Sequence, residues 1–225
     1  MSHERIMKKY QGLEGQQYQQ TKHGVPEERY AWVARDRARK IQPYVSSVDV
    51  VFEYGVGTGW NLAALECRTK IGYDISYAVK ETVERHKIRF VDDLSLIVDD
   101  SVDIAICHHV LEHVPDPLHV LEIMRNKLKD SGKLLLFAPY QFDRRYRQFN
   151  REDTDHHIYS WNVQTLSALV ESTGYRVIEA GMGPFGYETF AALRSRFGEA
   201  GYHTLIGVLR FIRPVHEIRI VAHKT

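Results

Sequence analysis

Three glycines spaced two apart follow an apolar run, and this pattern constrains the fold more than any other stretch of the chain. The run covers residues 50–54 and includes Glu53, and it leads directly into Gly55, Gly57 and Gly59. Glycine adopts positive φ and has no Cβ, so a ligand can lie against the main chain where a larger residue would collide. The pattern predicts a β-strand followed by a backbone loop built for close approach of a ligand.

A carboxylate, Asp74, ends the next apolar run, residues 69–74. An acid about 20 residues after such a loop binds ribose hydroxyls in dinucleotide-type folds. A nicotinamide or flavin fingerprint also needs a small residue at the position that Trp60 occupies here. The spacing therefore predicts an adenosyl-type ligand and disfavours a nicotinamide.

Apolar runs of strand length alternate with amphipathic segments of helix length, which predicts a mostly parallel sheet with helices on both faces. Strands are expected at residues 48–54, 69–74, 88–91, 102–107, 133–138, 175–181 and 216–222. Helices are expected at residues 28–41, 60–67, 77–86, 117–128 and 162–172, with a further helix inside 184–213. Asp116 can cap the fourth helix and Pro117 suits its first turn, whereas residues 130–132 are expected to end it.

Glu53 and the three glycines resemble motif I of the class I S-adenosylmethionine-dependent methyltransferases. Residues 108–117, His-His-Val-Leu-Glu-His-Val-Pro-Asp-Pro, are similar to the segment after the fourth strand of Methyltransf_11-type enzymes. The part from Leu111 onward resembles the ubiquinone-pathway O-methyltransferases. The resemblance covers roughly residues 45–182 and implies a Rossmann-like, seven-stranded, mostly parallel sheet whose last strand is antiparallel.

The resemblance also implies which residues bind S-adenosylmethionine. The glycines would face its methionine portion with Glu53 near the ammonium, and Asp74 would bind the ribose with Ile75 beside the adenine. The adenine edge would meet Asp92 and Leu94, with Asp93 as an alternative to Asp92. His108 would close the far side of the site. The expected cofactor-binding residues are Glu53, Gly55, Gly57, Gly59, Asp74, Ile75, Asp92, Leu94 and His108.

Histidines gather after the fourth strand, at the edge where open α/β sheets bind ligands. A histidine there can accept a proton from an acceptor hydroxyl near neutral pH. His109 is the first candidate, and His113 either takes part or packs under the following turn. Tyr140, after the fifth strand, is expected to line the acceptor pocket. His156 or His157 faces the acceptor or caps the next helix. The expected catalytic residues are His109, His113, Tyr140 and His157.

No metal site is expected from the spacing of potential ligands. His109 and His113 stand four apart, but Glu112 follows the wrong residues for the His-Glu-x-x-His pattern. Cys67 and Cys107 lie in apolar runs and form neither a disulfide framework nor a zinc motif. We therefore expect two reduced, buried thiols.

The charge balance and the apolar runs limit the partners. A formal net charge of +1 gives no broad footprint for nucleic acid. No apolar stretch reaches about 18 residues, so no membrane span is expected, and the protein is expected to be cytoplasmic. Residues 1–25 are expected to form an arm or lid, and residues 26–225 a single domain that is a monomer or a homodimer. Arginines at 144, 145, 147 and 151 offer binding to an anionic acceptor or form a solvated loop.

These features together predict methyl transfer from S-adenosylmethionine to a small-molecule acceptor. O-methylation is favoured over N-methylation because nearby histidines offer a proton acceptor. Two alternatives remain at this point. One is a catalytically silent S-adenosylmethionine-binding sensor or scaffold, and the other is an NAD-dependent oxidoreductase, which Trp60 argues against.

Overall fold

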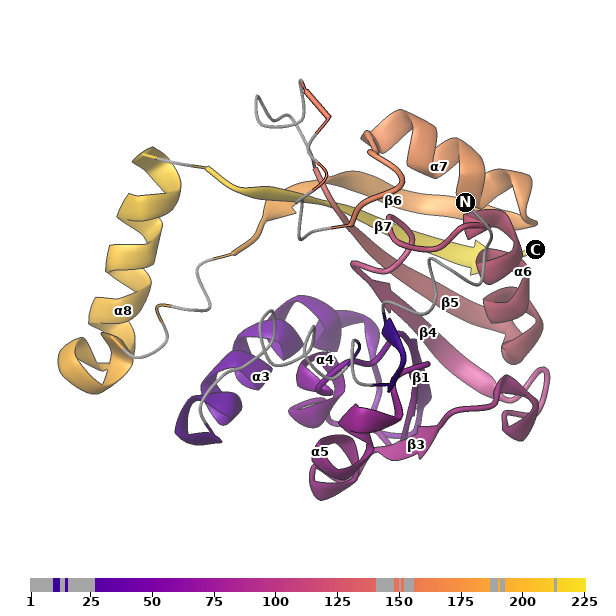
Figure 1. Ribbon diagram of the computed structural model, residues 1–225, viewed down its shortest axis with the longest axis horizontal. Helices are drawn as coiled ribbons and strands as arrows, with labels where there is room; N and C mark the ends of the chain where they lie inside the picture. The colour runs from indigo at the N-terminus through magenta and orange to yellow at the C-terminus, as the bar shows by residue number, and fades with distance from the viewer. Residues whose placement is uncertain are drawn as a thin grey trace.

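The computed structural model describes residues 10–12, 15, 27–140, 148, 149, 151, 156–186, 190, 193–212 and 214–225. The strands within these residues form one seven-stranded sheet (Figure 1). The strand order is β3-β2-β1-β4-β5-β7-β6. The strands are β1 (Val50–Tyr54), β2 (Thr69–Tyr73), β3 (Arg89–Val91), β4 (Val102–His108), β5 (Leu128–Pro139), β6 (Tyr175–Pro184) and β7 (His216–Lys224).

Strand directions follow the expected Rossmann-like pattern. β1 to β5 pair in parallel, and β7 pairs antiparallel with both β5 and β6. All seven predicted strands are confirmed, and β5 is longer than predicted because it begins at Leu128. The order changes direction between β1 and β4, so the loops after these two strands diverge and leave room for a ligand at the carboxyl edge.

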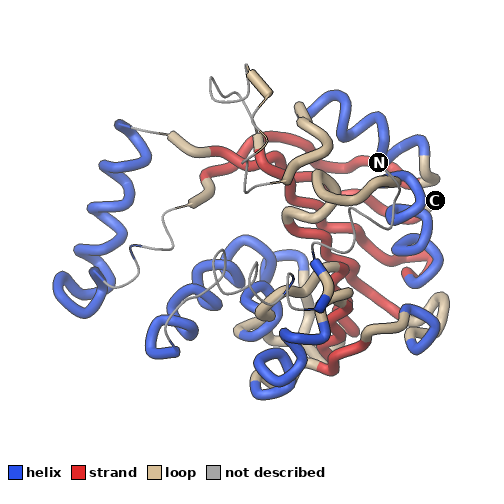
Figure 2. Tube along the Cα trace, viewed as in Figure 1, coloured by secondary structure: helices blue, strands red, loops and turns tan. Residues whose placement is uncertain are grey.

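Helices cover both faces of the sheet, with α3, α4 and α5 on one side and α6 and α7 on the other (Figures 1 and 2). The helices are α3 (Glu27–Ile41), α4 (Trp60–Ala63), α5 (Lys80–Arg85), α6 (Pro117–Lys127), α7 (Val163–Ser172) and α8 (Leu193–Ile212), with short 3-10 turns η2 (Gln42–Tyr44), η3 (Tyr77–Val79) and η4 (Leu94–Leu96). The Asp116 carboxylate caps α6 by accepting the His119 N–H at 3.0 Å. The helix ends at Lys127, within one residue of its predicted end, but the expectation that residues 130–132 end it is wrong: the backbone becomes extended at Leu128, so these residues belong to β5.

Side chains alternate along the central strands between two buried clusters. Phe52 and Ala105 point into the cluster that includes Leu121 and Met124 of α6. Val51 and Ile106, on the other face, pack in a second cluster with residues of α3 and α5. A period of two along a strand places successive residues on opposite faces, so both faces of the sheet are apolar and need helices to cover them.

The helix expected within residues 184–213 is α8, which lies beside the α3 end of the molecule, away from the sheet (Figure 1). It bends at Gly198, whose φ of 68° lies outside the helical region. Its Arg194 is buried, whereas Phe211 is 90% exposed. Of the helices described, none is long and apolar enough to cross a membrane.

Candidate active site

The glycine loop after β1 is held against the end of β2 by its own backbone. The N–H groups of Gly55 and Val56 donate to the Tyr73 carbonyl at 2.8 and 2.9 Å. Gly55 has a φ of +76°, and a Cβ there would lie 2.4 Å from a methyl group of Val110. This glycine is therefore required by the loop conformation and by the packing of the segment after β4, as well as by any ligand.

Asp74 fixes the same loop from the side. Its carboxylate accepts the Gly57 N–H at 2.9 Å and the Ser76 N–H at 2.8 Å. Burial raises the pKa of this carboxyl, and the two backbone hydrogen bonds oppose that shift. Because each carboxylate oxygen has two lone pairs, Asp74 can hold the loop and still accept a ligand hydroxyl.

A cavity of about 210 Å³ lies above the carboxyl ends of β1, β2 and β4. Seven of the residues expected from the sequence line it: Gly55, Gly57, Asp74, Ile75, His108, His109 and His113. Six do not line it: Glu53, Gly59, Asp92, Leu94, Tyr140 and His157. We call this space the donor cavity.

The six residues outside the lining occupy different surroundings. Asp92 is exposed, and Leu94 packs at the edge of the core. Tyr140 forms an isolated bridge with Trp161, and His157 lies with its ring 4.7 Å from that of His113. Gly59 faces inward, where a Cβ would lie 2.8 Å from Ile88. The expected arginines at 144, 145 and 147 lie outside the described residues.

Glu53 lies directly beneath the donor cavity and reaches it through Asn61, which lines the cavity. The Asn61 amide donates to Glu53 Oε1 at 2.5 Å. Glu53 Oε2 and Asn61 Oδ1 are buried and have no hydrogen-bond partner among the described residues. Burial raises the Glu53 pKa to about 8. Two buried hydrogen-bond acceptors that lack a hydrogen-bond donor suit a ligand ammonium group, which carries only N–H donors.

Two adjacent histidines form the far wall, with their rings stacked at 4.5 Å. His109 has a φ of +55°, and its N–H donates to the Phe137 carbonyl at 2.9 Å. A non-glycine residue in this region is strained, and such strain persists only where the surroundings hold it. The β4 to α6 connection thus turns sharply enough to aim both imidazoles at the cavity.

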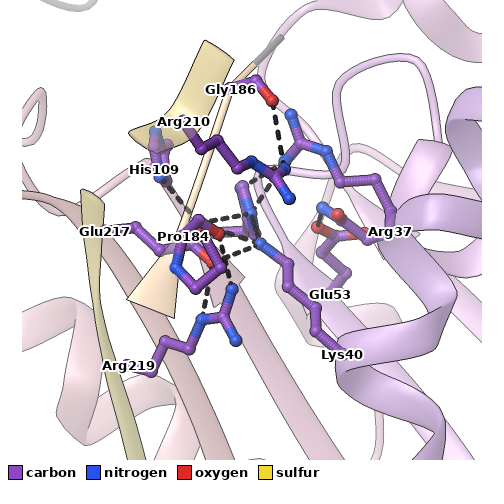
Figure 3. Close-up of polar contacts among 11 residues, drawn as sticks. Arg37, Lys40, Glu53, His109, Pro184, Gly186, Arg210, Glu217 and Arg219 are labelled. Atoms are coloured by element: carbon purple, nitrogen blue, oxygen red, sulfur yellow. Dashed lines mark hydrogen bonds and ion pairs between the residues drawn. The ribbon is translucent and has the colours of Figure 1, made fainter. Parts of the chain in front are cut away.

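Behind the histidines lies a buried charged cluster from α3 and β7 (Figure 3). Lys40 donates to Glu217 at 2.6 Å and lies 2.8 Å from His108 Nε2. Arg37 lies 2.7 Å from the same His108 nitrogen, and Arg219 donates to Glu217 at 2.9 Å. Glu217 is completely buried, and its charge is balanced by Lys40 from α3 and by Arg219 from its own strand.

These contacts set the protonation states at the wall. Burial lowers the His109 pKa to about 4, against the opposing effect of Glu217. Burial and the neighbouring cations lower the His108 pKa well below its usual value. Burial also lowers the Lys40 pKa to about 7, although Glu217 opposes this shift. Both histidines are therefore neutral at neutral pH.

Several site residues were missed by sequence reasoning. Arg37 and Lys40 lie three apart on the helix that precedes the glycine loop, and Tyr10 and Phe185 line the donor cavity from both ends of the chain. Glu217 carried the one usable signal, since a carboxylate within an apolar strand requires a buried partner. That Glu217 lies beside His109 follows only from the tertiary structure.

Solved structures share this architecture at low sequence identity. A possible histamine N-methyltransferase from Thermotoga maritima superposes with a TM-score of 0.60, at 17% identity, over 88% of this chain and 94% of its own. An S-adenosylmethionine-dependent methyltransferase from Archaeoglobus fulgidus superposes with a TM-score of 0.59, at 20% identity, over 87% of this chain and 94% of its own. A third structure is a phosphoethanolamine N-methyltransferase from Haemonchus contortus in complex with phosphomonomethylethanolamine and S-adenosylhomocysteine. It superposes with a TM-score of 0.57, at 16% identity, over 87% of this chain and 56% of its own.

Sequence comparison supplies the family. None of the curated proteins matches the sequence significantly. A family profile described as a methyltransferase domain, Methyltransf_23, matches residues 27–180, which is more than half of the chain and includes the glycine loop, Asp74 and the histidine segment. The chain therefore belongs to this methyltransferase domain family and is an S-adenosylmethionine-dependent methyltransferase.

Proposed function

We propose that the protein methylates an oxygen of a small acceptor that carries a carboxylate or phosphate group. The main support is a second cavity, of about 340 Å³, between α3, α8 and the adjoining ends of β6 and β7. It shares Arg37 and Phe185 with the donor cavity, so the two cavities adjoin, and an acceptor that extends past these side chains would reach the methyl group. We call it the acceptor cavity.

Among the described residues, cationic side chains outnumber carboxylates in the lining of the acceptor cavity, although Lys40 and Arg219 also balance the buried Glu217, and Arg39 pairs with Glu199 at 2.6 Å. The lining contains Asp36 as a single carboxylate, together with the cations Arg37, Arg39, Lys40, Arg210 and Arg219. Asp36 already pairs with Arg194 at 2.6 Å. Arg210 donates to the Gly186 carbonyl at 3.4 Å, a weak contact that leaves its charge for a ligand (Figure 3). Guanidinium groups bind carboxylate and phosphate oxygens with two parallel hydrogen bonds, which favours an anionic acceptor.

Oxygen is favoured as the methylated atom because His109 can receive a hydroxyl proton. S-adenosylmethionine supplies an activated methyl group, so the protein has to align the acceptor and remove its proton. The His109 Nε2 atom lies 3.4 Å from Glu217 Oε2, and this carboxylate would stabilise the imidazolium formed by proton transfer. A neutral amine attacks without prior loss of a proton, so it gains less from this base.

The cofactor-binding roles follow the sequence expectation, with Asn61 added. Glu53 and Asn61 would accept the methionine ammonium, Gly55 and Gly57 would lie against its chain, and Asp74 would accept the ribose hydroxyls. Asp92 and Leu94 would meet the adenine only at the outer margin, since neither lines the donor cavity.

We also propose that the N-terminal arm forms a lid over the donor cavity and that the protein is a homodimer. Tyr10 lines the donor cavity, and its hydroxyl lies 3.0 Å from His113 Nδ1, which supports a lid formed by residues 1–25 over a single domain of residues 26–225. The exposed apolar residues Phe211 and Ile212 support a homodimer over a monomer. Free Cys67 and Cys107 support a reducing compartment, the cytoplasm.

A methyl-transfer assay with paired acceptors tests this function. The panel holds phenols and amines, each with and without a carboxylate or phosphate. We expect the anionic phenols to be methylated fastest. Arg210→Gln should raise the KM for these acceptors by about 10- to 100-fold, because a hydrogen bond to a charged group contributes about 1.5–3 kcal/mol.

Arg196→Gln is the matched control, since Arg196 is exposed on the same helix α8 and lies outside both cavities. Its KM should equal that of the wild type. Transfer only to uncharged acceptors would refute the anionic assignment. Preferred transfer to anionic amines would show that nitrogen, and not oxygen, is the methylated atom. N-methylation is the chemistry named for the phosphoethanolamine enzyme of Haemonchus contortus.

A further inference from the structure

Three potential metal ligands converge beside the donor cavity. Glu112 and His113 come from the turn after β4, and His157 comes from the segment before α7. Their ligand atoms all lie within 4.8 Å of one another, and His113 Nε2 lies 3.9 Å from Glu112 Oε1. The Glu112 carbonyl accepts the N–H groups of Ile158 and Tyr159 at 2.7 and 3.2 Å. Backbone hydrogen bonds therefore fix the two segments relative to each other.

The Glu112 carboxyl group lacks the partner that its burial requires. Its side chain is 1% exposed, and neither carboxyl oxygen has a hydrogen-bond partner among the described residues. Within the same residues, His113 is its only ion-pair contact, and no lysine or arginine lies within ion-pair distance. Buried carboxyl groups are normally paired with a cation, hydrogen-bonded or bound to a metal. A bound cation would supply the partner that these two oxygens lack.

A second cluster of the same composition has its charge already balanced. His108, His109 and Glu217 also place ligand atoms within 4.8 Å of one another. There, however, Lys40 lies 2.6 Å and Arg219 2.9 Å from the Glu217 carboxylate. A divalent ion at that position would be repelled by both cations. Of the two clusters, the Glu112 cluster is therefore the one whose charge a metal ion would balance.

We propose that Glu112, His113 and His157 bind a divalent first-row transition-metal ion. Two imidazoles and one carboxylate are the protein ligands of several catalytic zinc sites and of non-haem iron sites. Zinc bonds of about 2.0–2.2 Å place neighbouring donor atoms roughly 3.3–3.6 Å apart, so small side-chain rotations would close the site. The Tyr10 hydroxyl lies 3.0 Å from His113 Nδ1 and orients the ring, whose Nε2 lies 3.9 Å from Glu112 Oε1.

This site differs from the sequence expectation of no metal. That expectation tested His109 and His113 against a local spacing rule. The spatial cluster instead uses the carboxylate adjacent to His113 and a histidine from a distant segment, which no local spacing can reveal.

The position of the site suggests what the ion does. Three protein ligands leave coordination positions open, and His113 lines the donor cavity. An ion there could bind the acceptor hydroxyl and lower its pKa. This role rests on the proposed oxygen methylation, whereas metal binding itself does not.

Calorimetry on untagged protein, first stripped with a chelator, tests the binding directly. Zn²⁺, Mn²⁺ and Mg²⁺ are titrated without acceptor. We expect one Zn²⁺ or Mn²⁺ per chain and weaker binding of Mg²⁺, which prefers oxygen ligands. Glu112→Gln and His157→Gln should each lower the affinity by about tenfold or more.

His119 and Glu122 provide the matched control. This histidine and glutamate lie 3.8 Å apart on α6, and both are exposed. The double variant H119Q/E122Q should bind the metal as the wild type does. Equal binding by wild type, E112Q and H157Q, or no binding by the wild type, would overturn the inference.

Thermal unfolding separates loss of the site from loss of the fold. Metal should raise the Tm of the wild type and of H119Q/E122Q, and at the same metal concentration should raise the Tm of H157Q less. Should Glu112→Gln fail to fold, His157→Gln still decides the question, because its side chain is only partly buried. Metal binding without methyl transfer would support the metal site and refute the proposed function. Methyl transfer without metal binding would support the proposed function and refute the metal site.

Discussion

The Lys40 ammonium lies 2.6 Å from the carboxylate of Glu217, and the side chain of Glu217 is fully buried. The two residues come from the first described helix and the last strand, and they meet behind the histidines that line the donor cavity. Arg219 completes the neutralisation at 2.9 Å. The far wall of the active site thus depends on one buried ion-pair cluster.

Glu217→Gln should destabilise the protein by less than the about 3–5 kcal/mol typical of breaking a buried ion pair, because Lys40, whose pKa burial already lowers to about 7, can lose its proton once its partner is gone. The double variant Lys40→Met, Glu217→Gln should recover much of that loss. The free energy of unfolding from urea titration measures both. Asp99→Asn, which removes the exposed partner of Lys127, is the control and should cost less than about 1 kcal/mol. An additive double variant would show that the two charges do not interact.

Cofactor-product affinity should depend on the ionisation of Glu53. Burial raises its pKa to about 8, so at neutral pH the free protein holds it mostly protonated. A bound ammonium favours the carboxylate, so S-adenosylhomocysteine affinity should rise with pH up to about 8, by at most about tenfold per unit. Calorimetry over this range should show the slope in the wild type and none in Glu53→Gln. A slope that persists in the variant would assign the titration to another group.

Asp74→Ala should weaken S-adenosylhomocysteine binding by about 1–3 kcal/mol, since it removes a ligand acceptor and frees two loop N–H groups. Calorimetry measures the change. Asp130→Ala, at a fully exposed carboxylate, is the control and should bind like the wild type. Unchanged affinity in Asp74→Ala would move the ribose to a different part of the cavity.

His109 should make stability depend on pH. Its folded pKa of about 4 lies below the unfolded value of 6.5, so the unfolded state binds the proton first. The stability that neutral His109 contributes is present above pH 6.5 and is lost as the pH falls toward 4. The stability difference between wild type and His109→Asn should therefore shrink by up to about 1.4 kcal/mol per pH unit in this window. Asparagine suits the positive φ there, and urea titrations at several pH values give the difference.

Much of the fold could be predicted from local patterns. The seven strands and the cap at Asp116 depend on hydrophobic periodicity and short-range hydrogen bonds, which neighbouring residues determine. Residues 130–132 look like a helix stop, whereas they lie inside β5 between Leu128 and Lys133, which pair with β4 on either side of a register shift. Tertiary pairing overrode a local signal at that point.

The cofactor side of the site was predictable to a similar extent. Gly55, Gly57 and Asp74 line the donor cavity because each follows a strand whose carboxyl end must lie at the same edge of a parallel sheet. Asp92 lies at the end of the edge strand β3, where the chain is exposed, so strand position alone could not bring it to the cavity.

The sequence by itself determined the sheet, the glycine loop and the family, since these depend on residues close together in the chain. Only the tertiary structure decided that Glu217 stands behind His109, that Asn61 links Glu53 to the cavity, and that Glu112 meets His157. The physical reason is that a buried charge or polar group takes its partner from whatever segment packs against it, and that segment can come from anywhere in the chain.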